Sequence, residues 1–142
     1  MYQLFRITGC EASLDSFCRI GLLEHCSPLE KHALYLYQAL KLLCRRDGHT
    51  YIKRSWLEHE ARNVHSKYQA SPRAGASQQA AVDWGEVQDF LEGWQVIVRE
   101  NNGRHVYLYK YWNAEMKIAE GFRTLRKRHK VDPWTFDIDV EK

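Results

Sequence analysis

The positions of apolar and polar residues follow two spacings along this chain, and the clearer one is helical. Residues 27–48, SPLEKHALYLYQALKLLCRRDG, carry one apolar stripe with steps of three and four positions. Its members are Leu29, Ala33, Leu36, Leu40 and Leu43. Ser27 and Glu30 have the spacing of a capping box, and Pro28 follows Ser27, where its missing N–H leaves no helical hydrogen bond unmade. We therefore predict a helix that begins after Ser27 and ends at Gly48, which can adopt a left-handed cap.

Two further helices are predicted from their first residues. Ser55 and Glu58 repeat the capping-box spacing and predict a helix that runs to about Val64. Asp83 is a good N-cap for the stretch VDWGEVQDFLEGW, which we expect to be helical as far as Gly93.

Short runs with the residue types of strands predict a small sheet. HTYI, residues 49–52, is a short strand candidate, and WQVIVREN (94–101) and HVYLYKYW (105–112) are rich in β-branched and aromatic residues. The dipeptide Asn102-Gly103 lies between the last two runs and favours the tight turn of a β-hairpin.

The order of elements predicts the fold. After the hairpin, Asn113 can cap a last helix that bears Ile118, Phe122 and Leu125 on one side and stops before Pro133. From the first long helix onward the order is helix, short strand, helix, helix, strand, turn, strand, helix. This is the order of a winged helix with the hairpin as its wing. We predict an α+β, mostly helical fold: a winged-helix-like core with a C-terminal β-hairpin wing followed by a helix.

The same pattern divides the chain into parts. Residues 1–26 are expected to form a helical lead-in, and 27–130 the winged-helix-like domain. Within that domain, residues 67–79 (KYQASPRAGASQQ) have no apolar period and are expected to be a mobile loop. Residues 131–142 are expected to be a linker. Met1 runs directly into YQLFRITGC, which suggests an excised domain with an added start residue.

The lead-in has two interpretations. Ile20-Gly21-Leu22 has the hydrophobic–Gly–hydrophobic pattern of a degraded helix-hairpin-helix turn. A helix that ends near a glycine explains the triplet equally well.

Composition and cysteine usage narrow the class of protein. A chain with 44% hydrophobic and 13% aromatic residues can build a core, and a net charge of +3 is too small to indicate nucleic acid by itself. The cysteines are Cys10, Cys18, Cys26 and Cys44. None forms a C-x-x-C pair, so we expect reduced thiols, with His25, His32 and Cys26 as the alternative of a metal site. No apolar run approaches the roughly 20 residues of a membrane span, and the start does not resemble a signal peptide, so we expect a soluble intracellular protein with no membrane partner.

The third helix of a winged helix usually reads the major groove, yet here it is acidic. Helical rotation places Trp84, Val87, Phe90 and Leu91 on one side, and Glu86, Asp89 and Glu92 on the other. The helix contains no Lys or Arg. Outward carboxylates repel phosphates, so we assign Glu86, Asp89 and Glu92 to protein docking, with an ordinary solvated face as the plain alternative.

Positive charge gathers in two other places. The wing region carries Arg99, Arg104 and Lys110, and the segment RTLRKRHK carries Arg123, Arg126, Lys127, Arg128 and Lys130. These eight residues are our candidates for DNA contact, although cations at a helix C-terminus also complement its dipole. Aromatic residues accompany the wing cations: Tyr107, Tyr109, Tyr111 and Trp112. Such rings can stack on bases, but with Val106 and Leu108 among them about half must instead be buried.

Catalytic motifs are absent from the sequence. It contains no phosphate-binding G-x-x-x-x-G-K-[ST] loop, no G-x-S-x-G elbow and no H-E-x-x-H pair. We therefore expect that this chain is not an enzyme and binds no cofactor.

Residues 34–125 resemble a known module. GHTYIKRSWL, EVQDFLEGWQVIVRE and VYLYKYWNAEMKIAEGFRTL are similar to the region just ahead of the motor in RecD-type superfamily-one DNA helicases, and most similar to its cysteine-containing, aromatic-rich eukaryotic branch. The sequence departs from the family in three ways. All motor motifs are missing, the 67–79 loop is long, and the upstream helix-hairpin-helix signal is degraded, which leaves duplex contact by that part in doubt.

The resemblance implies a parent protein with its own activity and partners. That parent would be a nuclear, ATP- and magnesium-dependent 5′-to-3′ DNA helicase acting in DNA replication, replication stress and the DNA damage response. Residues 131–142 would be the linker toward its motor domain, which this sequence lacks. The motor domain and single-strand DNA-binding protein would be partners of this module. The leading hypothesis is a non-catalytic accessory domain for protein docking, with non-specific single-strand DNA contact. The alternatives are a module whose main role is to bind single-stranded DNA, and a stand-alone winged-helix regulator.

Overall fold

The computed structural model describes residues 14–69 and 82–129 of the 142-residue chain. The chain divides into two compact units, Met1–Trp112 and Asn113–Lys142. The first part of the expected lead-in, most of the expected loop, Lys130 and the expected linker lie outside the described residues.

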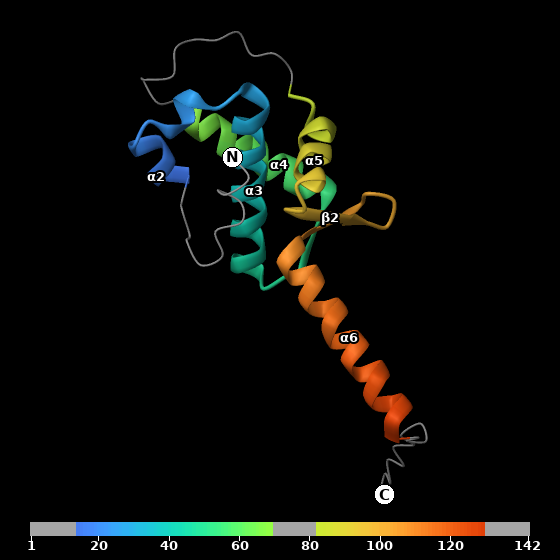
Figure 1. Ribbon diagram of the computed structural model, residues 1–142. Helices are drawn as coiled ribbons and strands as arrows, with labels where there is room; N and C mark the ends of the chain where they lie inside the picture. The colour runs from blue at the N-terminus through green and yellow to red at the C-terminus, as the bar shows by residue number, and fades with distance from the viewer. Residues whose placement is uncertain (1–13, 70–81, 130–142) are drawn as a thin grey trace, which may run out of the picture. The chain divides into compact units, whose positions relative to one another are not determined.

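Three helices surround the core of the first unit. α3 (Pro28–Asp47) packs against α4 (Arg54–Gln69) and α5 (Trp84–Gly93), as Figure 1 shows. The capping box of α3 is confirmed: the Ser27 N–H donates to Glu30 Oε2 at 2.8 Å, and the Glu30 N–H donates to Ser27 Oγ at 3.3 Å. Gly48 ends the helix with φ 66°, also as predicted. The predicted stripe of α3 is buried in the core except for Leu29, which is half-buried.

α4 differs from its predicted bounds at both ends. It starts at Arg54, directly after the first strand, so Ser55 lies inside the helix and the predicted capping box is wrong. The Glu58 carboxylate instead accepts a hydrogen bond from Arg54 Nε, one turn earlier, at 2.7 Å. At its other end α4 continues to Gln69, through the first three residues of the expected loop. Tyr68 in this last turn packs against the core, which favours the longer helix.

A three-stranded antiparallel sheet closes the first unit. Its order is β1-β3-β2, with β1 at Tyr51–Lys53, β2 at Ile97–Glu100 and β3 at His105–Leu108. The predicted hairpin turn is confirmed. The Arg104 N–H donates to the Asn101 carbonyl at 3.1 Å, and the two central residues, Asn102 and Gly103, have φ 54° and 76°. Residues 101–104 connect the two strands, and Asn101 also has a positive φ, 53°. Positive φ at the two central residues matches the right-handed twist of the strands.

β3 is shorter than predicted, and the helix that follows it is longer. β3 ends at Leu108, and α6 (Tyr109–His129) begins there instead of at Asn113. Leu108 pairs with Ile97, the first residue of β2, so no described strand remains to pair with the chain beyond it. The Tyr109 N–H makes one last bond to the Val96 carbonyl at 3.0 Å. Because backbone groups need partners, the chain then satisfies them within a helix.

Alternation along the strands gives the sheet two faces. On the inner face Ile52, Ile97, Val106 and Leu108 are at most 2% exposed and join the helices in the core. The opposite positions of β1 and β3 are Tyr51, Lys53, His105 and Tyr107, which pair as Tyr51 with Tyr107 and Lys53 with His105. We call these four residues the outer sheet face.

The described part of the lead-in precedes α3. It contains α2 (Leu14–Arg19) and a short 3-10 helix, η1 (Leu22–His25). Between them Gly21 adopts φ 73°, and its N–H donates to the Cys18 carbonyl at 3.2 Å. Leu14 and Phe17 of α2 are buried against the core. The element order, the small sheet and the hairpin wing together confirm the predicted mostly helical winged-helix fold.

Candidate functional site

α5 occupies the place of the groove-reading helix, and it begins as the sequence predicts. The Asp83 carboxylate caps it by accepting from the Gly85 N–H at 2.8 Å and the Glu86 N–H at 3.2 Å. Trp84, Val87, Gln88 and Leu91 are buried. Phe90, which rotation assigned to the apolar side, is only half-buried.

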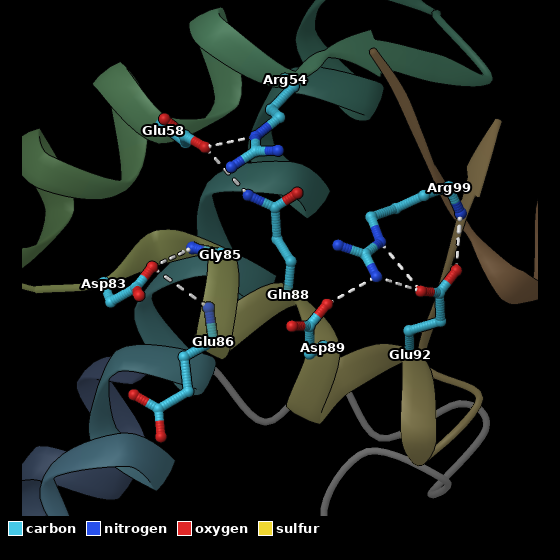
Figure 2. Close-up of polar contacts among 9 residues, drawn as sticks. All are labelled: Arg54, Glu58, Asp83, Gly85, Glu86, Gln88, Asp89, Glu92 and Arg99. Atoms are coloured by element: carbon cyan, nitrogen blue, oxygen red, sulfur yellow. Dashed lines mark hydrogen bonds and ion pairs between the residues drawn. The ribbon is translucent and has the colours of Figure 1, made fainter. Parts of the chain in front are cut away.

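Gln88 lies on the buried side of α5, which sequence reasoning missed. It is 0% exposed, and its Nε2 donates to Glu58 Oε1 at 3.0 Å. The same Glu58 oxygen accepts from Arg54 Nε, so a polar network joins α4 to α5 (Figure 2). Within the described residues Gln88 Oε1 has no hydrogen-bond partner. The signal that could have found it is its rotation angle, which at 100° per residue lies about 40° from that of the buried Trp84.

Arg99 is the residue whose position changes the picture most. It pairs with Val106 across the hairpin, so strand alternation turns its side chain to the inner side of the sheet, toward α5. There its Nε donates to Glu92 Oε2 at 2.8 Å, and its Nη2 donates to Asp89 Oδ1 at 2.6 Å and also to Glu92 (Figure 2). The Arg99 N–H adds a bond to Glu92 Oε1 at 3.2 Å. The hydrogen bonds that Arg99 donates to Glu92, and then the one that it donates to Asp89, raise the pKa of Arg99 above its usual value.

This arrangement gives Arg99, Asp89 and Glu92 a structural role within the domain. The Arg99 side chain is 22% exposed, and its guanidinium is already matched by carboxylates. The hypothesis that Arg99 contacts DNA stays a prediction, but such contact would require these ion pairs to break.

The α5 outer surface remains acidic after this pairing. We define it as Glu86, Asp89, Glu92 and the aromatic pair Phe90 and Trp94. Glu86 is exposed, and its carboxylate has no hydrogen bond or ion pair with any described residue. Trp94 is 41% exposed and lies edge-on to Phe90 with ring centroids 6.3 Å apart. Carboxylates beside an exposed indole are typical of a surface that binds protein, because the ring can anchor and the charges can select a basic partner.

The other basic candidates are exposed where the structure describes them. Arg104 lies in the wing turn, and Arg123, Arg126 and Lys127 lie on α6. Arg128 belongs to α6, but its side chain is not described, and Lys130 lies beyond the described residues.

Lys110 is also exposed and lies 4.9 Å from the centre of the Tyr111 ring. Burial, and secondarily the nearby Lys110 ammonium, lowers the pKa of Lys41 on α3. These two lysines therefore place positive charge at the start of α6.

Among the wing aromatics strand alternation applies to Tyr107 alone, because Tyr109, Tyr111 and Trp112 lie in the first turn of α6. Val106 and Leu108 are buried, whereas Tyr107, Tyr109, Tyr111 and Trp112 are half-buried. Trp112 Nε1 donates to Glu100 Oε1 at 2.7 Å and so ties the start of α6 to the end of β2.

The structure contains no evident metal site or membrane span in its described residues. Within 14–69 and 82–129 no group of three or more His, Cys, Asp or Glu residues is placed to hold a metal ion. His32 instead contacts the His65 ring edge-on at 5.0 Å, and the Cys26 thiol donates to the Leu22 carbonyl at 3.5 Å. None of the described helices is long and apolar enough to cross a membrane.

Comparison with known proteins agrees with the fold. A mouse protein, DNA helicase B, is 31% identical over 141 residues, which is 99% of this chain but 11% of the mouse protein. No solved structure matches significantly. The family model described as the DNA helicase B winged helix domain matches residues 1–107. The chain therefore belongs to the family of DNA helicase B winged-helix domains, as its resemblance to the RecD-type helicases led us to expect.

Proposed function

We propose that this chain is the non-catalytic accessory domain of a DNA helicase and that it docks a basic protein surface on the α5 outer surface. The observation that supports this most is the charge of α5. Four carboxylates, those of Asp83, Glu86, Asp89 and Glu92, lie on or next to the helix, and among the described residues only Arg99 forms ion pairs with any of them.

Duplex reading by α5 is disfavoured by the same charges. Groove readers place Arg, Lys, Asn or Gln side chains against base edges, and basic contacts release counterions from the phosphates. On α5 the one such residue, Gln88, is fully buried, so it cannot reach a base.

The family suggests which partners to test. The parent would be a nuclear 5′-to-3′ DNA helicase of replication, replication stress and the DNA damage response, with ATP and magnesium held by its motor domain. The motor domain and single-strand DNA-binding protein are the two docking candidates. Docking to the motor domain and docking to single-strand DNA-binding protein are both part of our proposal.

Glu86→Lys tests docking with little structural disturbance, because the Glu86 carboxylate is exposed and unpaired, whereas Asp89 and Glu92 hold Arg99. The 142-residue chain would be immobilised and titrated with the purified motor domain and with single-strand DNA-binding protein. We expect one of them to bind, and Glu86→Lys to weaken its binding roughly tenfold through like-charge repulsion.

Glu24→Lys is the matched control, since Glu24 is also exposed but lies on η1. It should leave the affinity unchanged. If neither candidate binds, or if both variants behave alike, α5 is not the docking surface.

Single-strand DNA binding is the second candidate function, and the exposed cations favour it. Arg104, Lys110, Arg123, Arg126 and Lys127 are all exposed. Arg104→Met should therefore weaken binding of a labelled oligothymidine, while Arg99→Met should not, because the Arg99 guanidinium already contacts Glu92 and Asp89. Equal effects of the two substitutions would show that Arg99 leaves its carboxylates to bind DNA.

A further inference from the structure

Aromatic rings on the outer sheet face lie outside the buried core. This face was defined above by Tyr51, Lys53, His105 and Tyr107. The inner positions Ile52 and Val106 are 1% and 0% exposed, which shows that the opposite side of the sheet faces away from the core. Tyr51 on that opposite side is 40% exposed. The face is formed by β1 and β3, so it involves neither α5 nor the basic segment of α6.

The rings of this face hold one another in place. The centroid of the Tyr51 ring lies 4.5 Å from that of the His105 ring and 5.5 Å from that of the Tyr107 ring. The interplanar angles are 34° and 39°. His105 and Tyr107 are half-buried, so they support the more exposed Tyr51 from β3. Cross-strand pairing explains why the rings touch. It also fixes Tyr51 as a rigid, partly open platform on which a flat ligand can stack.

Unpaired cations lie beside this platform. Lys53 is exposed and lies two residues after Tyr51 on β1, on the same face of the sheet. Arg104 is exposed and directly precedes His105 in the chain. The Arg54 N–H donates to the Arg104 carbonyl at 2.8 Å, which holds the wing turn next to the end of β1. Neither Lys53 nor Arg104 forms an ion pair with any described residue, in contrast to Arg99.

One carboxylate shares this side of the sheet but is engaged. Glu100 pairs with His105 in the ladder, and its Oε1 accepts the Trp112 indole N–H at 2.7 Å. The surroundings of the rings therefore favour an anion, whereas the α5 outer surface favours a cation.

We propose that the outer sheet face binds single-stranded DNA, with a base stacked on Tyr51 and the adjoining phosphates held by Lys53 and Arg104. Stacked rings combined with phosphate contacts are the common chemistry of sequence-tolerant single-strand binding. Tyr51 and Lys53 are two residues apart on one strand, about 7 Å, so both can contact the same or neighbouring nucleotides. Duplex DNA is excluded from this mode, because its bases are already stacked and paired.

The inference gives the second candidate function a defined site, and it does not depend on protein docking at α5. The two proposals can therefore fail separately. Glu86→Lys tests docking and should leave DNA affinity nearly unchanged, while substitutions at Tyr51 test the sheet.

The experiment uses fluorescence anisotropy of labelled oligothymidine with the 142-residue chain at low and moderate salt, beside a labelled duplex. Tyr51→Leu removes the flat ring but keeps apolar bulk, and we expect it to raise the Kd about tenfold, in the range for one lost stack. Tyr51→Phe keeps the ring and should stay within about twofold of the wild type. Lys53→Gln should weaken binding and reduce the slope of log K against log salt by about 0.7, the value for one phosphate contact to a single strand.

Two controls separate this site from general effects. Trp94→Leu removes a ring of matching exposure, 41%, from the end of α5 and should leave the Kd unchanged. Thermal unfolding shows whether each variant folds. If Tyr51→Leu does not fold, Lys53→Gln still tests the site. A photoreactive thymidine in the oligonucleotide should crosslink to the peptide that contains Tyr51.

Three results would overturn the proposal. If the wild-type protein does not bind oligothymidine at low salt, the outer sheet face does not bind single-stranded DNA. Equal affinity for duplex excludes stacking as the mode. Unchanged binding by folded Tyr51→Leu and Lys53→Gln, together with loss of binding by Arg126→Gln/Lys127→Gln, would move the site to α6.

Discussion

The ion pair between Arg99 and Glu92 can be measured by a double-mutant cycle. Arg99→Met keeps the apolar stem of the side chain but removes the guanidinium. Glu92→Gln removes the charge but keeps an oxygen that can still accept from the Arg99 N–H, which now lies 3.2 Å from Glu92 Oε1. The double variant completes the cycle, so changes unrelated to the pair cancel.

The structure sets the expected size of the coupling. Ion pairs in open solvent are worth about 0.2–1 kcal/mol, whereas buried hydrogen bonds to charged groups reach about 1.5–3 kcal/mol. The Arg99 side chain is 22% exposed and Glu92 is 38% exposed, so solvent still screens the pair considerably. We therefore expect a coupling of about 1 kcal/mol, which is resolvable because errors in such cycles are about 0.3–0.5 kcal/mol.

Urea unfolding is the appropriate assay, since guanidinium chloride is itself a salt and would screen the charges. The coupling should decrease when sodium chloride is added. Arg46 and Asp47 supply a control pair, because they approach to 3.0 Å while the Arg46 side chain is 62% exposed. Their cycle should give no resolvable coupling. If the Arg99–Glu92 cycle also gives none, or a value that salt does not change, the pair does not tie the wing to α5 in solution.

Three further predictions follow from other parts of the fold. Burial lowers the pKa of His32 and His65 from 6.5, and their mutual repulsion adds to the effect at His32, so below that pH the unfolded chain binds more protons than the native one. The contribution of these histidines to the free energy of unfolding should be complete above pH 6.5 and should be lost as the pH falls through their lowered native pKa values. The urea midpoint of His65→Gln should therefore fall less with decreasing pH than that of the wild type, and an equal fall in both proteins would contradict this. Burial raises the pKa of the Cys44 thiol to about 11, so iodoacetamide near neutral pH should label the exposed Cys18 before Cys44, which mass spectrometry of timed samples can check. Ser27→Ala removes the cap of α3 and should lower the free energy of unfolding by about 1 kcal/mol in urea, while Ser27→Asp should restore most of it.

Local chemistry made several features of this protein predictable from the sequence. Ser27 with Glu30, and Asp83 before its helix, are capping patterns whose hydrogen bonds form within one turn. Asn102-Gly103 specifies its turn because both residues tolerate positive φ. These signals depend on neighbours in the chain, and their order was enough to indicate a winged helix and the acidity of its third helix.

The features that failed depend on contacts between distant segments. β3 ends at Leu108 because its partner strands stop there. Gln88 can be buried because its side-chain amide donates a hydrogen bond to the carboxylate of Glu58, thirty residues earlier. Arg99 is a different case, because its contact with DNA stays a prediction. What the sequence could not show is that Arg99 pairs with Glu92 and Asp89.

Only the tertiary structure could decide which groups Arg99 contacts. The register of the hairpin pairs Arg99 with Val106, and a shift of one residue would turn its guanidinium to the other face of the sheet. In the observed register it meets Glu92 and Asp89, while Tyr51 stays on the outer sheet face. The sequence determined which charges and rings the domain possesses. The pairing of its strands determined which of them bind each other and which remain available to a partner.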